Sequence, residues 1–147
     1  MTNGNNRLAQ FIDAPGGITA EAARERAEAR LGRLRERSDV TVSECIERIG
    51  AALSACEQPT PELREEMYRM AYGVANLAGT FDRPALGQAA YSLCALLDDC
   101  DVRNHWDRVG VHVHHDALRM LQSRTLTPPA VERLLAGLDA VRKRCRS

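Results

Sequence analysis

The chain has 147 residues, enough for one domain, since domains typically span about 100–200 residues. Hydrophobic residues make up 44% and charged residues 27%, which excludes a mostly disordered or collagen-like chain. Twenty basic residues balance twenty acidic ones, whereas nucleic-acid-binding proteins usually carry a basic surplus, so no nucleic-acid partner is expected. No apolar run approaches the roughly 20 residues that cross a bilayer, and the polar segment Met1–Gln10 lacks the apolar core of a signal peptide. We therefore expect a cytoplasmic protein without membrane contact.

The first third of the chain predicts a tail followed by two helices. Residues 1–18 hold several Asn and Gly residues and are expected to form a mobile N-terminal tail. Thr19 is expected to cap a helix over about 19–37. Thr41 and Glu44 fit a capping box, in which the hydroxyl and the carboxylate each bond an unpaired backbone N–H. A second helix is therefore expected over about 42–56.

Four further helices are expected in the rest of the domain, which spans 19–147. Each follows a residue that can cap a helix, in two cases with proline at the first helical position. They cover about 61–79 after Thr60 and Pro61, about 83–98 after Asp82, about 104–122 from Asn104, and about 128–145 after Thr127 and Pro128. β-branched residues never alternate over a strand-length run, and the loops are short. These features predict an all-α bundle of antiparallel neighbours.

Apolar residues recur at helical spacing and predict the buried face of each helix. Over 42–56 the stripe is Val42, Cys45, Ile46, Ile49, Leu53 and Cys56; over 104–122 it is Trp106, Val109, Val113, Ala117 and Met120; over 128–145 it is Val131, Leu134, Leu135, Leu138 and Val141. Trp106 is thus expected in the core.

The helix over 61–79 has two distinct faces. Its apolar residues fall within about 40° of one direction, and they are Leu63, Met67, Met70, Val74, Leu77 and Phe81. The opposite direction is centred on Tyr72, with Tyr68 one turn before it, Asn76 one turn after it and Gly79 near the end. We expect an exposed strip there; the alternative is that the tyrosines lie against a neighbouring helix or the N-terminal arm.

The segment Met67–Phe81 resembles the signature of histidine phosphotransfer (Hpt) domains, which reads in outline A-H-x-L-K-G-x-x-G-x-F/L. The similarity extends through Pro84–Gly87 and Ser92–Leu97, which match the helix that follows the signature. The segments Phe11–Pro15 and Val113–Leu118 also resemble an alphaproteobacterial branch of Hpt-like proteins. The resemblance covers about residues 11–145. It implies an antiparallel four-helix bundle with additional helices, acting in a two-component phosphorelay.

Three positions of the signature differ from the family. Tyr72 aligns with the phosphoaccepting histidine, Ala75 with the lysine and Asn76 with the glycine that leaves room for a receiver domain. A tyrosine hydroxyl has a pKa of about 10 and is a poor nucleophile without a base. Its phosphate ester is also too stable to pass on readily. The chain thus resembles an Hpt domain that has lost phosphotransfer.

The resemblance implies a binding module rather than an enzyme, with no catalytic residue, cofactor or metal. Its partner would be a response-regulator receiver domain or a histidine kinase, and its docking face would comprise Tyr68, Tyr72, Ala75, Asn76 and Gly79. Two alternatives remain open: an active phosphocarrier that uses a histidine outside the motif, or a helical adaptor unrelated to receivers.

The histidines and cysteines offer weaker candidate sites. On one helix, His112, His114 and His115 point in directions spread over about 160°, so they cannot converge on one ion without another helix. His112 and Asp116 are spaced for a hydrogen-bonded pair. The five cysteines include no C-x-x-C pair, so we expect small apolar side chains on helix faces, notably at Cys45, Cys56 and Cys94.

Overall fold

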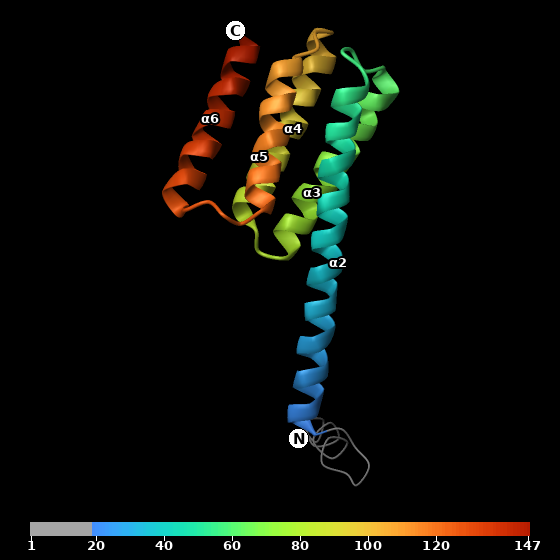
Figure 1. Cartoon of the computed structure of the whole chain (residues 1–147), viewed down its shortest axis with the longest axis vertical. Coiled ribbons are helices and arrows are strands. Elements are labelled where there is room, and N and C mark those ends of the chain that lie inside the picture. Colours follow the sequence, from blue (N-terminus) through green and yellow to red (C-terminus); the bar gives the residue numbers. More distant parts are fainter. Residues whose placement is uncertain (1–18) are drawn as a thin grey trace, which may run out of the picture. The chain divides into compact units, whose positions relative to one another are not determined.

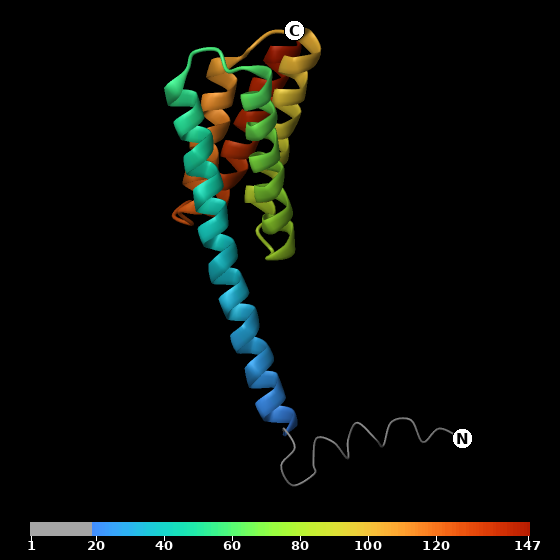
Figure 2. The same cartoon turned by 90° about the vertical axis from the view of Figure 1, so that its right-hand side faces the viewer.

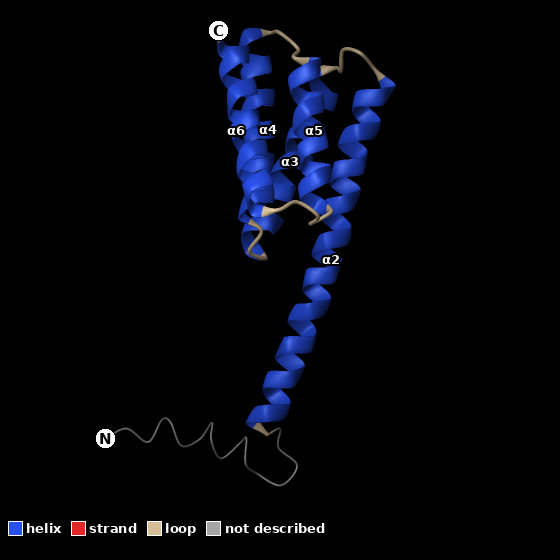
Figure 3. Cartoon of the chain, turned by 60° about the vertical axis from the view of Figure 1, so that its left-hand side comes forward, coloured by secondary structure: helices blue, strands red, loops and turns tan. Residues whose placement is uncertain are grey.

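The computed structural model describes residues 19–147, and all of its regular structure is helical (Figure 1). The helices are α2 (Ala20–Ala55), α3 (Pro61–Thr80), α4 (Pro84–Arg103), α5 (Arg108–Gln122) and α6 (Pro128–Arg146). No strand occurs within these residues (Figure 3), and the predicted all-α fold is confirmed. None of the described helices is both long and apolar enough to span a membrane. The expected mobile tail over 1–18 lies outside the described residues.

The chain divides into two units, Met1–Ser38 and Asp39–Ser147, and the division falls within α2. In the first unit the description begins at Thr19, whose hydroxyl accepts a hydrogen bond from the Ala22 N–H at 3.1 Å. This bond confirms the predicted cap. The apolar side chains of this part of α2 are sparse, and Leu31 and Leu34 are each nearly half exposed.

The second unit is a bundle whose helices alternate in direction. From Asp39 onward α2 runs one way, α3 returns, and α4, α5 and α6 continue the alternation with short loops (Figure 2). α4 lies at the centre, because it packs against α3, α5 and α6. α2 is joined to α5 by the His115 Nε2–H, which donates to the Ile46 carbonyl at 3.0 Å.

The core of this unit is apolar and follows most of the predicted stripes. In α2 the buried residues include Val42, Ile46, Ile49 and Leu53; in α3 they include Met67, Met70 and Val74; in α6 the buried residue is Leu138. Cys94 and Cys100 are buried in α4, while Cys45, Cys56 and Cys145 are partly buried, and all five are free thiols. Apolar burial of this kind is the main favourable term in folding.

α2 continues without a break where two helices were expected. The prediction of a capping box at Thr41 and Glu44 is therefore wrong. No glycine or proline stands between residues 38 and 41 to end the helix. Ser, Asp, Val and Thr cost at most about 0.7 kcal/mol each in a helix interior. Burial of Val42 and Ile46 in the following turns offsets that cost.

Two other predicted caps are also wrong. Asp82 adopts a left-handed conformation (φ 55°), and α4 starts after Arg83 instead. Asn104 does not open α5 but closes α4, again in the left-handed conformation that Asn tolerates well (φ 50°). The cap of α5 is Asp107, whose Oδ1 accepts from the Gly110 N–H at 2.9 Å. The cap expected at Thr60 is in place, since its hydroxyl accepts from the Leu63 N–H at 3.2 Å. Thr127 stands at the predicted N-cap position of α6, but its side chain makes no capping hydrogen bond.

The buried face of α5 differs from the predicted stripe. Val109, Val113 and Met120 are exposed, Trp106 precedes the helix and is partly buried, and of the predicted stripe only Ala117 is buried. The other buried residues are Gly110, Val111, His114, His115, Leu118 and Leu121. α5 can bury the face that carries His114 and His115 because both imidazoles have hydrogen-bond partners there.

Arginines close the C-terminal ends of three helices in this unit. Each guanidinium comes from α4, α5 or the residue before α4 and donates to a carbonyl in or just after the last turn of another helix. The bonds join Arg108 to the Cys56 carbonyl at 2.7 Å, Arg83 to the Leu121 carbonyl at 3.0 Å, and Arg103 to the carbonyls of Cys145 and Arg146.

Candidate functional site

The phase of α3 places Tyr72 on the surface, as predicted. The Thr60 cap and Pro61 start the helix, and Met67, Met70 and Val74 enter the core on the opposite side. Tyr72 is 46% exposed. The expected exposed strip and its alternative, tyrosines packed against a neighbouring helix, are therefore each confirmed in part. Tyr72 reaches solvent and also contacts a residue of α4.

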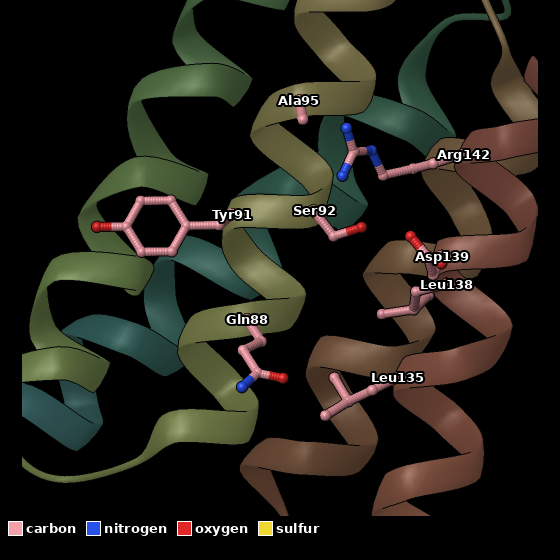
Figure 4. Close-up of a pocket in the computed structure, with 8 residues that line it drawn as sticks. All are labelled: Gln88, Tyr91, Ser92, Ala95, Leu135, Leu138, Asp139 and Arg142. Carbon is pink, nitrogen blue, oxygen red and sulfur yellow. The ribbon is translucent and has the colours of Figure 1, made fainter. Parts of the chain in front are cut away.

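Three tyrosines form a continuous surface, which we call the tyrosine cluster. The Tyr68 and Tyr72 rings are stacked, with centroids 6.4 Å apart and planes 7° from parallel. Tyr91 of α4 meets Tyr72 edge to face at 6.3 Å and 76°, and it points from α4 toward α3 (Figure 4). Aromatic pairs of this geometry contribute about 0.5–1.5 kcal/mol each. These contacts favour the observed positions of the three rings.

A groove of about 480 Å³ continues from the cluster between α3 and α4. Its lining includes Ala75, Asn76, Gly79, Gln88 and Tyr91, so three more of the predicted site residues lie at this groove. Ala75 is different: it is 1% exposed, and the expectation that its side chain lies on the exposed face is wrong. It is covered where α4 approaches closely at Gly87, whose added Cβ would lie 3.8 Å from the Ala75 carbonyl oxygen.

The Tyr68 hydroxyl and the Cys94 thiol are both uncharged at neutral pH. The negative charge of Asp98 raises the pKa of the Tyr68 hydroxyl above its ordinary value of 10. Burial raises the pKa of the Cys94 thiol to about 11, and this thiol donates to the Tyr68 carbonyl at 3.9 Å. Neither group supplies an anionic nucleophile at neutral pH.

The histidines of α5 do not line this surface. His114 and His115 are buried, at 0% and 8% exposure, whereas His112 is partly exposed. The expected His112–Asp116 pair is replaced by a 3.7 Å approach of His115 Nδ1 to Asp116 Oδ1. Within residues 19–147, no group of three or more His, Cys, Asp or Glu side chains is arranged to hold a metal ion.

Sequence reasoning missed Tyr91 as a member of the cluster. Its signal was present, because the buried residues of α4, among them Leu86, Leu93 and Leu97, leave Tyr91 on the opposite side of the helix. The contact with Tyr72 depends on how α3 and α4 pack, and no local pattern encodes that.

Comparisons of the chain with protein-family models, with curated proteins and with solved structures find no match. The site is accordingly defined by its own geometry: a half-exposed aromatic cluster centred on Tyr72, beside a groove between two antiparallel helices.

Proposed function

We propose that this protein is a pseudo-phosphotransfer module that docks on the receiver domain of a response regulator without carrying phosphate. A histidine kinase is the second partner that the resemblance to Hpt domains implies. The observation that carries the proposal is the position of Tyr72, which aligns with the phosphoaccepting histidine and lies half exposed at the centre of the tyrosine cluster.

The cluster is suited to binding a protein surface. Tyrosine supplies a large contact area with only two side-chain torsions to fix, and aromatic residues often dominate interface energies at about 2 kcal/mol or more each. The Tyr72 ring already contacts Tyr68 and Tyr91, which reduces the entropy lost when a partner fixes the ring. The adjoining groove gives an apolar segment of the partner a place to lie.

The same surface lacks what phosphate transfer needs. Transfer requires an exposed imidazole and a nearby cation, but the two aligned positions hold Tyr72 and the buried Ala75. His114 and His115 are buried and hydrogen-bonded, so neither can approach a phosphoaspartate. An active phosphocarrier would therefore need His105 or His112, which lie outside the signature.

Binding of the protein to a panel of purified receiver domains, measured by biolayer interferometry, tests the proposal. Tyr72→Ala should weaken binding at least about tenfold, or about 1.4 kcal/mol. It should lower the free energy of unfolding by about 1–3 kcal/mol, because two ring contacts of about 0.5–1.5 kcal/mol each are lost. The matched control is Val109→Ala on α5, an exposed apolar side chain outside the cluster, which should bind like the parent.

Two outcomes would count against the proposal. If Tyr72→Ala and the parent bind every receiver and kinase equally, or bind none, the cluster is not a docking face for these proteins. If the protein accepts acid-labile phosphate from a phosphorylated receiver, it is an active phosphocarrier, and the loss of label in His105 or His112 variants would locate the acceptor.

A further inference from the structure

A serine and a histidine meet on the other side of α4. The Ser92 Oγ lies 2.8 Å from His114 Nε2, and His114 Nδ1 lies 2.7 Å from the Gly110 carbonyl oxygen. A carbonyl oxygen only accepts, so Nδ1 of the neutral ring carries the proton and Nε2 carries the lone pair. The Ser92 hydroxyl must therefore donate to Nε2, which leaves the Oγ lone pairs facing away from the ring.

Ser92 also lines a groove of about 470 Å³ between α4 and α6. Ser92 and Arg142 reach into this space from opposite helices, beside the apolar side chains of Leu135 and Leu138 (Figure 4). The Arg142 Nε is buried and has no hydrogen-bond partner among the described residues. The carboxylate on the same helix, Asp139, is bound to Lys143 at 2.8 Å. The groove thus combines a polarised hydroxyl with the positive charge of Arg142, and the Asp139 carboxylate also lines it.

We propose that Ser92 is a nucleophile toward carboxylic esters that bind in the α4–α6 groove, with His114 as its general base and Arg142 as the partner of the developing oxyanion. The arrangement has the three parts that nucleophilic catalysis requires: a hydroxyl, a base within hydrogen-bond reach, and a group that orients the base. The orienting group here is the Gly110 carbonyl. The reacting groups are not Tyr68 or Tyr72, although Gln88 and Tyr91 line both this groove and the groove between α3 and α4.

The reaction proceeds in two balanced halves. Ser92 Oγ attacks the ester carbonyl carbon while its proton passes to His114 Nε2, and the negative charge on the carbonyl oxygen faces Arg142. The C–O bond to the alcohol then breaks, and the alcohol leaves with the proton from Nε2. Water next attacks the acyl–Ser92 ester and gives its proton to Nε2. Release of the carboxylic acid returns that proton to Ser92.

The lining of the groove indicates the class of ester. Ala95, Leu135 and Leu138 provide an apolar wall, which suits a short hydrocarbon acyl chain. Gln88 lies toward one end of the groove (Figure 4), where its amide can bond a polar leaving group. p-Nitrophenyl acetate and p-nitrophenyl butyrate are therefore the probe substrates.

The test is labelling of the full chain with a fluorophosphonate, which reacts with activated serines, followed by peptide mass spectrometry. The label should appear on Ser92, and Ser92→Ala should lose both label and ester hydrolysis. The matched control is Ser54→Ala, because the Ser54 hydroxyl donates to the Gly50 carbonyl at 3.0 Å and has no base. Label absent from Ser92, or equally strong on Ser54, would overturn the proposal without requiring any variant to fold.

The pH profile of hydrolysis by the parent protein gives a second readout. Burial lowers the pKa of His114 below its ordinary value of 6.5, and the Arg142 charge acts in the same direction, while the Gly110 carbonyl and Asp107 oppose it. On the α4 side, the His114 ring contacts Ser92, which carries no charge. The rate should therefore be level from about pH 8 down to 6.5 and fall only below that, as the base becomes protonated. A rate that rises tenfold per pH unit across this range would show hydroxide-driven hydrolysis and overturn the assignment.

Discussion

The ring of His115 packs against bare backbone at Gly50 of α2. A Cβ added at Gly50 would lie 2.7 Å from His115 Nε2 and 2.8 Å from Cε1. Ordinary contacts between such atoms are about 3.5 Å, so the ring in Gly50→Ala must move by about 0.8 Å. The ring is 8% exposed and its Nε2–H donates to the Ile46 carbonyl at 3.0 Å. A shift of that size away from α2 takes the bond beyond hydrogen-bonding distance.

The expected change in the free energy of unfolding of Gly50→Ala is the sum of three terms. Overpacking of a filled interior costs about 1–3 kcal/mol, and the lost hydrogen bond costs about 0.5–1.5 kcal/mol. Alanine is better than glycine inside a helix by about 0.8–1.0 kcal/mol, which opposes the other two. The net prediction is that Gly50→Ala lowers the free energy of unfolding by about 0.5–3.7 kcal/mol.

Urea denaturation followed by circular dichroism measures this difference. The matched control is Gly137→Ala in α6, where an added Cβ meets no atom within 4 Å. Only the helix-propensity term remains there, so Gly137→Ala should be more stable than the parent by up to about 1 kcal/mol. If Gly50→Ala is as stable as the parent or more so, the packing of the His115 ring against α2 described above is incorrect.

Two further predictions concern α5. Asp107→Ala removes the cap at the Gly110 N–H and should cost about 0.5–2 kcal/mol in urea denaturation, whereas Asp107→Asn keeps an acceptor oxygen and should cost less; equal losses would contradict the cap. Burial lowers the pKa of both His114 and His115, so the unfolded chain binds more protons than the folded chain below pH 6.5. The free energy of unfolding should therefore be level above that pH and decrease between about pH 6.5 and 5; a flat profile across that window would contradict the burial of the two neutral rings.

Local chemistry explains which helix boundaries could be predicted from the sequence. Thr60 with Pro61, and Thr127 with Pro128, mark helix starts because proline has no N–H to lose there, and both starts are correct. Thr41 carries a similar signal, but no glycine or proline precedes it and the neighbouring side chains are buried, so the helix continues. A capping residue alone is therefore a weaker signal than a residue that cannot extend the preceding helix.

Polar groups that pair across helices could not be predicted. The stripe chosen for α5 counted only apolar side chains, and it missed a face in which His114 is satisfied by Ser92 and His115 by the Ile46 carbonyl. Those partners lie 22 and 69 residues away in the chain. The exposed strip of α3 was predictable because one helix defines it, whereas the contribution of Tyr91 required the packing of α4 against α3.

The arginines at the helix ends affect how the bundle opens. Each of the three, Arg83, Arg103 and Arg108, bonds carbonyls in or just after the last turn of a helix, where the regular helical hydrogen bonds end. Fraying of the last turns of α2, α5 and α6 therefore requires breaking contacts with a different helix, which couples these ends to the core. Slow amide hydrogen exchange should extend into these last turns instead of decaying toward them. Lysine, with a single charged centre, could not bridge two carbonyls with the fixed fork that Arg103 uses. The use of arginine at these helix ends therefore increases the cooperativity with which the bundle unfolds.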